Sequence, residues 1–325
     1  MGNAFYSSAQ AVVLEKTLFG SDRIKRMIES NGTEEILKIF AEVGFGDSIA
    51  NGTAETEKII EKEYSALLAF VKSVSPNESF KKLLLYPNDF KNAEALVKAK
   101  FLKTEYSDML SPNGYIDVNV LKDKIFADDY KSLPANMAKA LLKSDEVFVN
   151  KAATGQFING LFVKALYDEL FSLKLKNKIL DKVLKAKVDF INAGVALRSR
   201  DFASASNFFV HNGDLSSEDL RFICERTPDE IRERFKFYDI YSVLEKGVAA
   251  LSEGVGFSAF EIAAESYPVV LMKKYRYSNE GYIPFIRYCY FKLADISNAR
   301  VISVGKSGGL TKEEISERLR EYYEG

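Results

Sequence analysis

The sequence predicts an all-α protein, and three observations carry that prediction. Apolar residues recur at helical spacing along one face, as in the series Ile60, Tyr64, Leu67, Leu68 and Val71. Helix-start signals are frequent along the chain. Segments that alternate apolar and polar residues are scarce, and the best candidate for a strand, residues 301–304, is very short.

The helix ends can be placed from the N-terminus onward. Ser21 is expected to open a short helix, and Asn31-Gly32 to close it in the left-handed conformation. Thr227 with Glu230, around Pro228, has the pattern of a capping box with proline in the first turn. Thr311 with Glu314 repeats that box ahead of three apolar positions, namely Ile315, Leu319 and Tyr322.

A five-residue motif occurs three times, at intervals of about 100 residues. Residues 89–93, 189–193 and 295–299 each begin with Asp and carry Asn and Ala at the fourth and fifth positions. Basic residues follow each copy. The repeated polar and basic positions are the candidate interaction residues: Asp89, Asn92, Lys98, Lys100, Asp189, Asn192, Arg198, Arg200, Asp295, Asn298, Arg300 and Lys306.

The composition of this motif favours a packing role. Its large apolar residue and its alanine lie three residues apart and share one helical face, where the alanine permits close approach of a neighbouring helix. Asparagine is a poorer helix former than alanine by roughly 0.5 kcal/mol. Its return at the same place therefore predicts a hydrogen bond from helix to helix.

A turn and a new helix start follow each copy, at residues 114–117, 213–216 and 309–311. In the third copy this start arrives sooner, so the intervening helix is expected to be shorter or absent. We therefore expect three helical-bundle units at residues 1–110, 111–212 and 213–325.

Composition excludes several classes of function. Lys plus Arg number 45 against 46 Asp plus Glu, so the basic excess typical of nucleic-acid binders is missing. One histidine, His211, and two cysteines, Cys224 and Cys289, cannot assemble a His-based triad or a multi-ligand metal site. No catalytic residue, cofactor or metal is expected. The chain lacks an apolar run of about 18 residues and a secretory signal, which predicts a soluble protein of a reducing compartment without a membrane span.

Two segments invite a sharper interpretation. Gly305-Lys306-Ser307 resembles the end of a phosphate-binding loop, but Arg300 stands where that loop needs its first glycine, so a turn between helices is favoured. The aromatic stretch 275–291, with Lys273, Arg276 and Arg287 interleaved, could stack on a nucleic acid. Core packing with the cations reaching the surface explains it better.

The C-terminal segment resembles the end of the C subunit of archaeal-type ATP synthases, whose eukaryotic counterpart is the d subunit of the vacuolar ATPase. The resemblance rests on these residues: Ile286-Arg287-Tyr288, Lys292, Asp295, Asn298-Ala299-Arg300, Gly305-Lys306, Gly309-Leu310, Glu313-Glu314-Ile315 and Arg318-Leu319-Arg320. The first repeat and the start of the chain, Tyr6-Ser7-Ser8-Ala9 with Leu14, extend it over essentially the whole sequence.

This resemblance implies three similar subdomains arranged as a funnel on the cytoplasmic face of the proteolipid ring. It implies a peripheral, non-catalytic subunit that receives the central stalk subunits D and F and passes torque to the ring, so that H⁺ or Na⁺ crosses the membrane. The membrane stator subunit is a further expected contact, and nucleic acid is not. Basic residues near the ends of the repeated helices are expected to meet the ring or stalk.

Two other functions remain open from the sequence. A triplicated helical adaptor unrelated to rotary ATPases would have the same composition and repeat. A phosphate-binding enzyme using Gly305 to Ser307 would bind nucleotide as an isolated chain.

Overall fold

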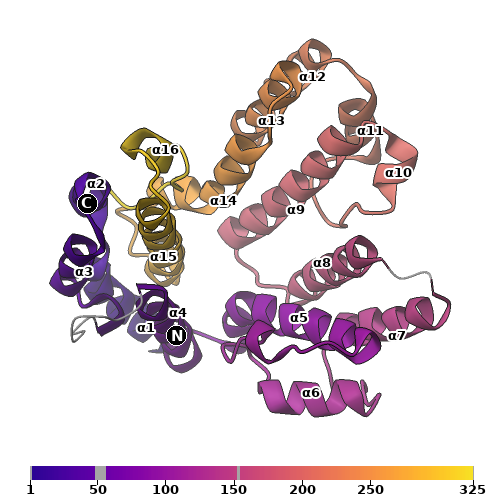
Figure 1. Cartoon of the computed structure of the whole chain (residues 1–325), viewed down its shortest axis with the longest axis horizontal. Helices are drawn as coiled ribbons and strands as arrows, with labels where there is room; N and C mark the ends of the chain where they lie inside the picture. The colour runs from indigo at the N-terminus through magenta and orange to yellow at the C-terminus, as the bar shows by residue number, and fades with distance from the viewer. Residues whose placement is uncertain (1, 48–55, 152–153, 325) are drawn as a thin grey trace. The chain divides into compact units, whose positions relative to one another are not determined.

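The computed structural model describes residues 2–47, 56–151 and 154–324, and every regular element in these residues is a helix (Figure 1). The all-α prediction is confirmed. Residues 301–304 belong to a long helix. None of the described helices combines the length and apolar composition needed to cross a membrane. The chain divides into two compact units, a terminal unit (Met1–Asn77 with Glu245–Gly325) and a middle unit (Glu78–Leu244).

The middle unit consists of eight α-helices and the start of a ninth. Their bounds are α5 Glu78–Leu102, α6 Val118–Phe126, α7 Ala135–Val149, α8 Gly155–Ser172, α9 Lys178–Ser199, α10 Phe202–Ser206, α11 Ser217–Glu225, α12 Pro228–Phe235 and α13 Tyr241–Glu253, with the 3₁₀ turn η3 at Ser107–Met109. The helix α8 packs on α5 and α7, and α11 packs on α9. The long helices α5 and α9 thus form the centres of two groups of helices within this unit.

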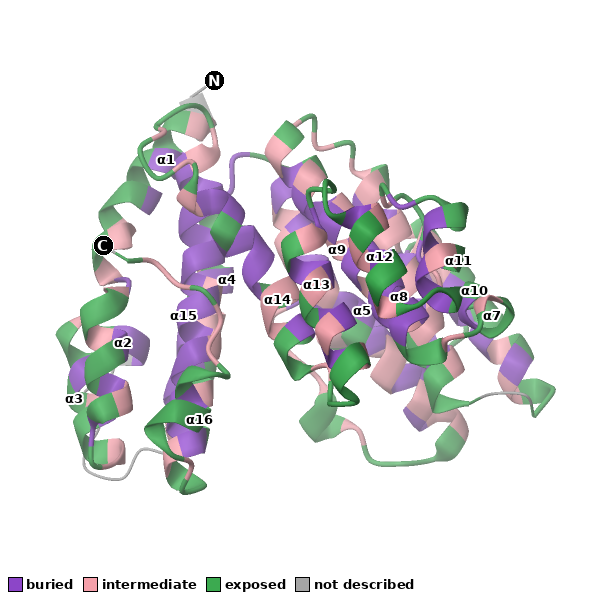
Figure 2. Ribbon diagram, turned by 90° about the horizontal axis from the view of Figure 1, so that it is seen from above, coloured by how far each residue is buried: buried purple, intermediate pink, exposed green. Residues whose placement is uncertain are grey.

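The terminal unit joins both ends of the sequence. Its helices are α1 Gly2–Leu14, α2 Gly20–Glu29, α3 Thr33–Glu42, α4 Thr56–Val74, most of α13, α14 Ser258–Lys273, α15 Ile283–Ser307 and α16 Lys312–Ser316, with 3₁₀ turns η1 at Glu15–Thr17 and η2 at Phe45–Asp47. The helix α15 is buried along most of its length (Figure 2). It contacts α1, α4 and α14, so it forms the core of this unit.

Most of the predicted helix starts are observed. Thr227 and Thr311 each cap a helix with the expected capping box, and Pro228 lies in the first turn of α12. The apolar face predicted for α4 is buried at Ile60, Leu67, Leu68 and Val71, whereas Tyr64 is half-buried. After the third repeat, α15 leads to α16 without an intervening helix, whereas α10 follows the second.

Three local predictions were wrong. The helix α2 begins at Gly20 rather than at Ser21, and Gly32 is extended (φ 174°) rather than left-handed. The helix that starts at Thr311 stops at Ser316, because the following segment runs back along α15 and bonds to it instead of continuing its own helix. The division into three helical-bundle units at residues 1–110, 111–212 and 213–325 stays a prediction; the contacts within the chain group it into two compact units.

Candidate functional site: a motif repeated on three helices

The three sequence copies lie on the long helices α5, α9 and α15. We call Asp, Asn three residues later and a basic residue eleven residues later the repeat motif. It comprises Asp89, Asn92 and Lys100; Asp189, Asn192 and Arg200; and Asp295, Asn298 and Lys306. All six Asp and Asn side chains are at most 2% exposed. Buried polar groups are costly unless they are hydrogen-bonded, so each needs a partner in the core.

Each asparagine of the repeat motif makes two hydrogen bonds to the backbone of a single residue. Asn192 donates to the Val210 carbonyl (2.9 Å) and accepts from the Val210 N–H (2.7 Å). Asn92 does the same with Ser111 (2.8 Å and 2.8 Å), and Asn298 with Arg320 (2.9 Å and 2.9 Å). A carboxamide suits this task because it offers a donor and an acceptor side by side.

The predicted helix-to-helix hydrogen bond was therefore wrong in its partner. Ser111, Val210 and Arg320 all lie outside helices. A helical residue engages its own N–H and C=O in the helix, whereas a loop residue has both groups available. The asparagines thus attach loops to the long helices.

The aspartates of the first two copies bind the chain just ahead of a short helix. Asp89 accepts from the N–H groups of Tyr115 (2.9 Å) and Ile116 (3.0 Å), directly before α6 and its N-cap. Asp189 accepts from those of Asp214 (3.2 Å) and Leu215 (2.9 Å), directly before α11 and its N-cap.

A glycine precedes each of these aspartate-bound turns for a steric reason. A Cβ at Gly114 would lie 2.0 Å from Oδ1 of Asp89, and one at Gly213 would lie 2.3 Å from Oδ1 of Asp189. Only glycine lets the turn approach the carboxylate this closely.

In the third copy the aspartate binds a different part of the chain. Asp295 accepts from the Phe19 N–H (2.9 Å), at the start of α2. Its Oδ1 makes no hydrogen bond within the described residues. Burial raises the pKa of Asp295 to about 7, against the opposing charge of Lys292, and burial likewise raises the pKa of Asp189 to about 6.

The basic residue of the repeat motif binds the far end of the same short helix. Lys100 donates to the Ile125 carbonyl of α6 (3.3 Å), and Arg200 donates to the Ile223 carbonyl of α11 (2.6 Å). Lys306 donates to the carbonyl of Ser30, the C-cap of α2 (2.9 Å). A cation at the C-terminus and an anion at the N-terminus both complement the helix dipole.

Each long helix therefore holds one short helix at both ends. Eleven residues of α-helix span about 16–17 Å, and the short helices α6, α11 and α2, of 9, 9 and 10 residues, span about 14–15 Å. In the third copy, α2 from the N-terminal segment takes the place that α6 and α11 hold in the first two. The third group of helices is thus completed by the opposite end of the sequence.

Of the other predicted interaction residues, two bond within their own helix and one bonds to a different helix of the terminal unit. Lys98 pairs with Glu94 on its own helix (2.5 Å), and Arg198 donates to the Gly194 carbonyl (3.1 Å). Arg300 pairs with Glu57 of α4 at 2.6 Å. The side chain of Arg198 is exposed to solvent and that of Lys98 is half-buried. Lys100, by contrast, also forms ion pairs with Asp128 and Asp145.

Two buried ion pairs in the terminal unit were not foreseen. Arg287, whose charge was expected to reach the surface, is instead buried and donates from Nε (2.6 Å) and Nη2 (3.0 Å) to the two carboxylate oxygens of Glu15. Lys292 pairs with Glu63 of α4. Both cations are at most 3% exposed. The partners are more than 220 residues apart in sequence, so no local signal could have matched them.

The segments that suggested other chemistry have structural explanations. Gly305 to Ser307 form the last turn of α15, and the turn follows at Gly308 and Gly309; the expected position of that turn was thus slightly early. Gly305 packs against Ile315 rather than wrapping a phosphate. His211 is exposed beside Asp168, and the described residues hold no group of three metal-ligating side chains.

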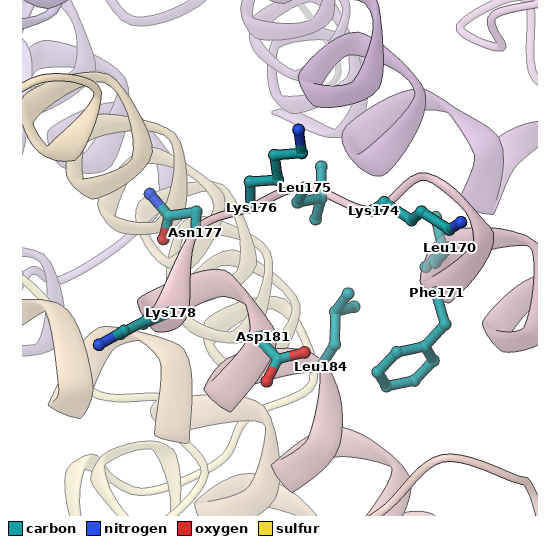
Figure 3. A pocket seen from close by; sticks show the side chains of 9 residues that line it. All are labelled: Leu170, Phe171, Lys174, Leu175, Lys176, Asn177, Lys178, Asp181 and Leu184. Atoms are coloured by element: carbon teal, nitrogen blue, oxygen red, sulfur yellow. The ribbon is translucent and has the colours of Figure 1, made fainter.

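A pocket of about 410 Å³ lies in the middle unit where α8 passes to α9. Lys174 and Lys176 both adopt left-handed backbone conformations in this connection. The amines of Lys174, Lys176 and Lys178 point in different directions around the hollow (Figure 3). Because these charges diverge, the pocket lacks the convergent polar groups of a ligand site.

Comparison with known proteins identifies relatives over the full length of this fold. The sequence model of the family described as ATP synthase (C/AC39) subunit matches residues 8–318. The C subunit of the V-type sodium ATPase of Enterococcus hirae is 20% identical over 95% of this chain and 96% of its own. The C subunit of the A-type ATP synthase of Methanocaldococcus jannaschii is 22% identical over 97% and 85%, respectively.

Proposed function

Because the chain belongs to the ATP synthase (C/AC39) subunit family, whose members are non-catalytic, we propose that it links the rotor shaft of a V/A-type ATPase to the membrane ring. The stalk subunits D and F form that shaft, and the proteolipid ring carries H⁺ or Na⁺. The chain transmits torque between them from the cytoplasmic face of the membrane. The match over residues 8–318 carries this proposal.

The internal bonding of the chain supports a mechanical role. Three long helices each hold a short helix at both ends and a loop through an asparagine. Charged groups that are buried and paired resist displacement, because separating them leaves an uncompensated charge in the core. A densely packed helical body deforms little under load, as a torque-transmitting part requires.

Symmetry further constrains the contacts with the ring. We propose three similar subdomains arranged as a funnel, present once per complex. Such a part cannot match the symmetry of a many-fold ring, so its contacts with successive ring subunits must differ. Charged residues near the ends of the repeated helices suit this task better than one complementary apolar patch.

Reconstitution tests the proposal directly. The purified chain is mixed with the stalk subunits D and F and with detergent-solubilised proteolipid ring, and complexes are separated by size. A stable complex with both is expected. Binding to neither would favour a helical adaptor unrelated to rotary ATPases.

Charge reversal can separate contact residues from structural ones. Lys98→Glu and Arg198→Glu are expected to weaken assembly with only a small fall in the thermal unfolding temperature, which for Lys98→Glu reflects the like charge of Glu94 one turn away. Lys100→Glu and Arg200→Glu are expected to weaken assembly and also to lower the thermal unfolding temperature. The reason is that the native side chains donate hydrogen bonds to the C-terminal ends of α6 and α11. Unchanged assembly in all four variants would count against a role for these residues.

A further inference from the structure

The hollow where α8 passes to α9 combines an apolar lining with a basic rim. Four apolar side chains line its volume of about 410 Å³, namely Leu170, Phe171, Leu175 and Leu184. Phe171 and Leu175 are only half-buried, so the hollow offers apolar surface to another molecule. Figure 3 shows these side chains around the opening, together with the lysines of the connection.

The rim carries three lysines whose charges have no partner in the protein. Lys174, Lys176 and Lys178 are exposed, and their amines form no hydrogen bond or ion pair within the part of the chain that the structure describes. Among the described lining residues Asp181 alone is acidic, and it pairs with Lys185 at 3.7 Å. The three amines are therefore available to a partner.

The start of α9 extends this positive charge. Residues 170–185 hold five lysines and one aspartate. Ion pairs add two further carboxylates, since Lys182 pairs with Asp239 and Lys185 pairs with Asp214 (2.9 Å). Five lysines against three carboxylates leave an excess of two positive charges.

The neighbouring helix ends do not remove this excess. The start of α5 lies beside the connection, and there Glu78 faces both Lys81 and Lys82. Glu169 is a further carboxylate, buried in α8. When both groups are included, seven lysines stand against five carboxylates, and the excess is again two.

The repeat shows that the fold does not need a lysine at the start of the long helix. Lys178 stands eleven residues before the aspartate of its motif, and the equivalent residues are Glu78 in the first copy and Pro284 in the third. An anion is favourable at the positive N-terminal end of a helix, whereas a cation there is unfavourable. Lys178 opposes the dipole of its own helix and has no internal partner, so its charge is suited to binding another molecule.

We propose that this hollow, with its rim of Lys174, Lys176 and Lys178, receives an acidic segment of a neighbouring subunit. Separate carboxylates of that segment meet the three amines, and one apolar side chain enters the hollow beside Phe171 and Leu175. The amines point in different directions, which suits an extended segment rather than a compact ligand. This inference rests on the proposed assembly with other ATPase subunits.

Three other occupants fit less well. A phosphate would need amines that converge on it, and it would leave the apolar lining unused. A second copy of this chain placed symmetrically on the hollow would set lysines against lysines, and such like-charge contacts are repulsive. A flat anionic membrane would meet the lysines but would leave the hollow empty. Each is an outcome of the experiments below.

Site-directed cross-linking identifies the occupant. A photoreactive aliphatic amino acid replaces Leu175 in the full-length chain, which is assembled with the stalk subunits D and F and the solubilised ring and then irradiated. The expected product joins residue 175 to a peptide of another subunit that is rich in Asp and Glu. The control carries the same group at Val149, an exposed valine of α7.

Other products would overturn the proposal. These are cross-links to a neutral or basic peptide, to lipid or to a second copy, or an assembled complex in which position 175 yields no more product than position 149. Failure of the unsubstituted chain to assemble at all would instead contradict the proposed function, and the proposal for the hollow would fall with it.

Charge reversal of the rim measures its electrostatic part. The triple variant Lys174→Glu, Lys176→Glu and Lys178→Glu is expected to weaken complex formation at least about tenfold, and added salt should no longer weaken it further. Leu175→Ser, which alters only the apolar part, is expected to weaken it severalfold without changing the salt dependence. Val149→Ser is the control for this last substitution.

A second triple variant is the matched control for the rim. It carries Lys103→Glu, Lys131→Glu and Lys151→Glu, at exposed lysines of the middle unit that form no ion pair within the described residues. Two of these lysines have the left-handed backbone that Lys174 and Lys176 also adopt. The control should bind as the unsubstituted chain does, and rim variants that assemble as tightly as the control would overturn the proposal for the hollow alone.

Folding is checked by circular dichroism and thermal unfolding. A glutamate at the first position of α9 favours its dipole, so reversal at Lys178 should not lower the unfolding temperature. If the triple reversal is nevertheless destabilised, the corresponding triple substitution by Gln replaces it and should weaken assembly in the same direction.

Two titrations of the isolated chain test the remaining occupants. The probes are inorganic phosphate and vesicles that contain phosphatidylglycerol, both at physiological ionic strength. Neither is expected to bind. Saturable binding of either probe that the rim substitutions abolish would overturn the assignment of the hollow to an acidic protein segment.

Discussion

At the scale of single residues, the repeat motif places six polar side chains in the core. Each buried asparagine has its donor and its acceptor satisfied by the C=O and N–H groups of one loop residue. The aspartates of α5 and α9 bind backbone N–H groups, whereas Asp295 keeps one oxygen without a hydrogen bond in the described part of the chain. The asparagines therefore attach a loop to the long helix in all three copies, whereas the aspartate carboxylate accepts fewer hydrogen bonds in the third copy than in the first two.

Removing one asparagine measures the strength of its two bonds. Asn192→Ala leaves the N–H and C=O of Val210 buried without their partner, so we expect the free energy of unfolding to fall by about 2–3 kcal/mol. Chemical denaturation checks this value. Asn119→Ala, at an exposed position of α6, is the control and should change stability by less than about 0.5 kcal/mol. Equal effects of the two substitutions would contradict the role of Asn192.

Asp295 should make stability depend on pH. Its pKa is raised to about 7 in the folded chain, whereas an unfolded Asp titrates near 3.9. Between these values the folded state binds the proton that the unfolded state has released, so stability is greatest at low pH and falls as pH rises toward 7. In Asp295→Asn this contribution is absent. The difference in unfolding free energy, unsubstituted chain minus variant, should shrink by about 2–3 kcal/mol from pH 5 to pH 8.

Denaturation of both proteins at several pH values tests this. Parallel stability curves from pH 5 to pH 8 would show that Asp295 titrates normally. Asp189→Asn is an informative comparison, because the pKa of Asp189 is raised only to about 6 and its effect should be complete at a lower pH.

At the scale of helices, a long helix with acid and base eleven residues apart matches a short helix of about ten residues. The acid lies at the positive end of the short helix and the base at the negative end, so both contacts are favourable. This geometry explains why basic residues recur at Lys100, Arg200 and Lys306. It also accounts for helices that are too short to be stable alone.

The glycine before each short helix should be indispensable for this arrangement. In Gly213→Ala the new methyl group would lie 2.3 Å from Oδ1 of Asp189 and 3.0 Å from Val188. Displacing the carboxylate should cost about 2 kcal/mol or more in unfolding free energy. Gly155→Ala, where a Cβ would meet nothing within 4 Å, should instead be neutral or slightly stabilising. The thermal unfolding of the two variants is compared. If Gly213→Ala is as stable as Gly155→Ala, the close approach of the Gly213 backbone to the Asp189 carboxylate is contradicted.

At the scale of the whole molecule, the two compact units differ in how the sequence builds them. The middle unit uses one continuous stretch, Glu78–Leu244. The terminal unit needs both ends of the sequence, since α15 binds Phe19, Ser30 and Glu63. Its folding must therefore await synthesis of the last 80 or so residues.

A fragment of residues 78–244 should fold without the rest of the chain. Both of its long helices keep their short helices and their loops within this range. We expect it to be helical by circular dichroism and to unfold cooperatively with temperature. Residues 1–77 alone are the control and should not, because they lack α15. A disordered 78–244 fragment would contradict the division into two units.

The sequence alone determined the helices and the three copies of the motif, because periodicity, capping boxes and repeated residues act over a few neighbouring positions. Only the tertiary structure decided what the motif binds. Asp295 reaches Phe19 across 276 residues, and Arg287 reaches Glu15 across 272. No local sequence pattern specifies these partners. A buried charge needs a complementary group in contact with it, and the packing of distant segments determines which group that is.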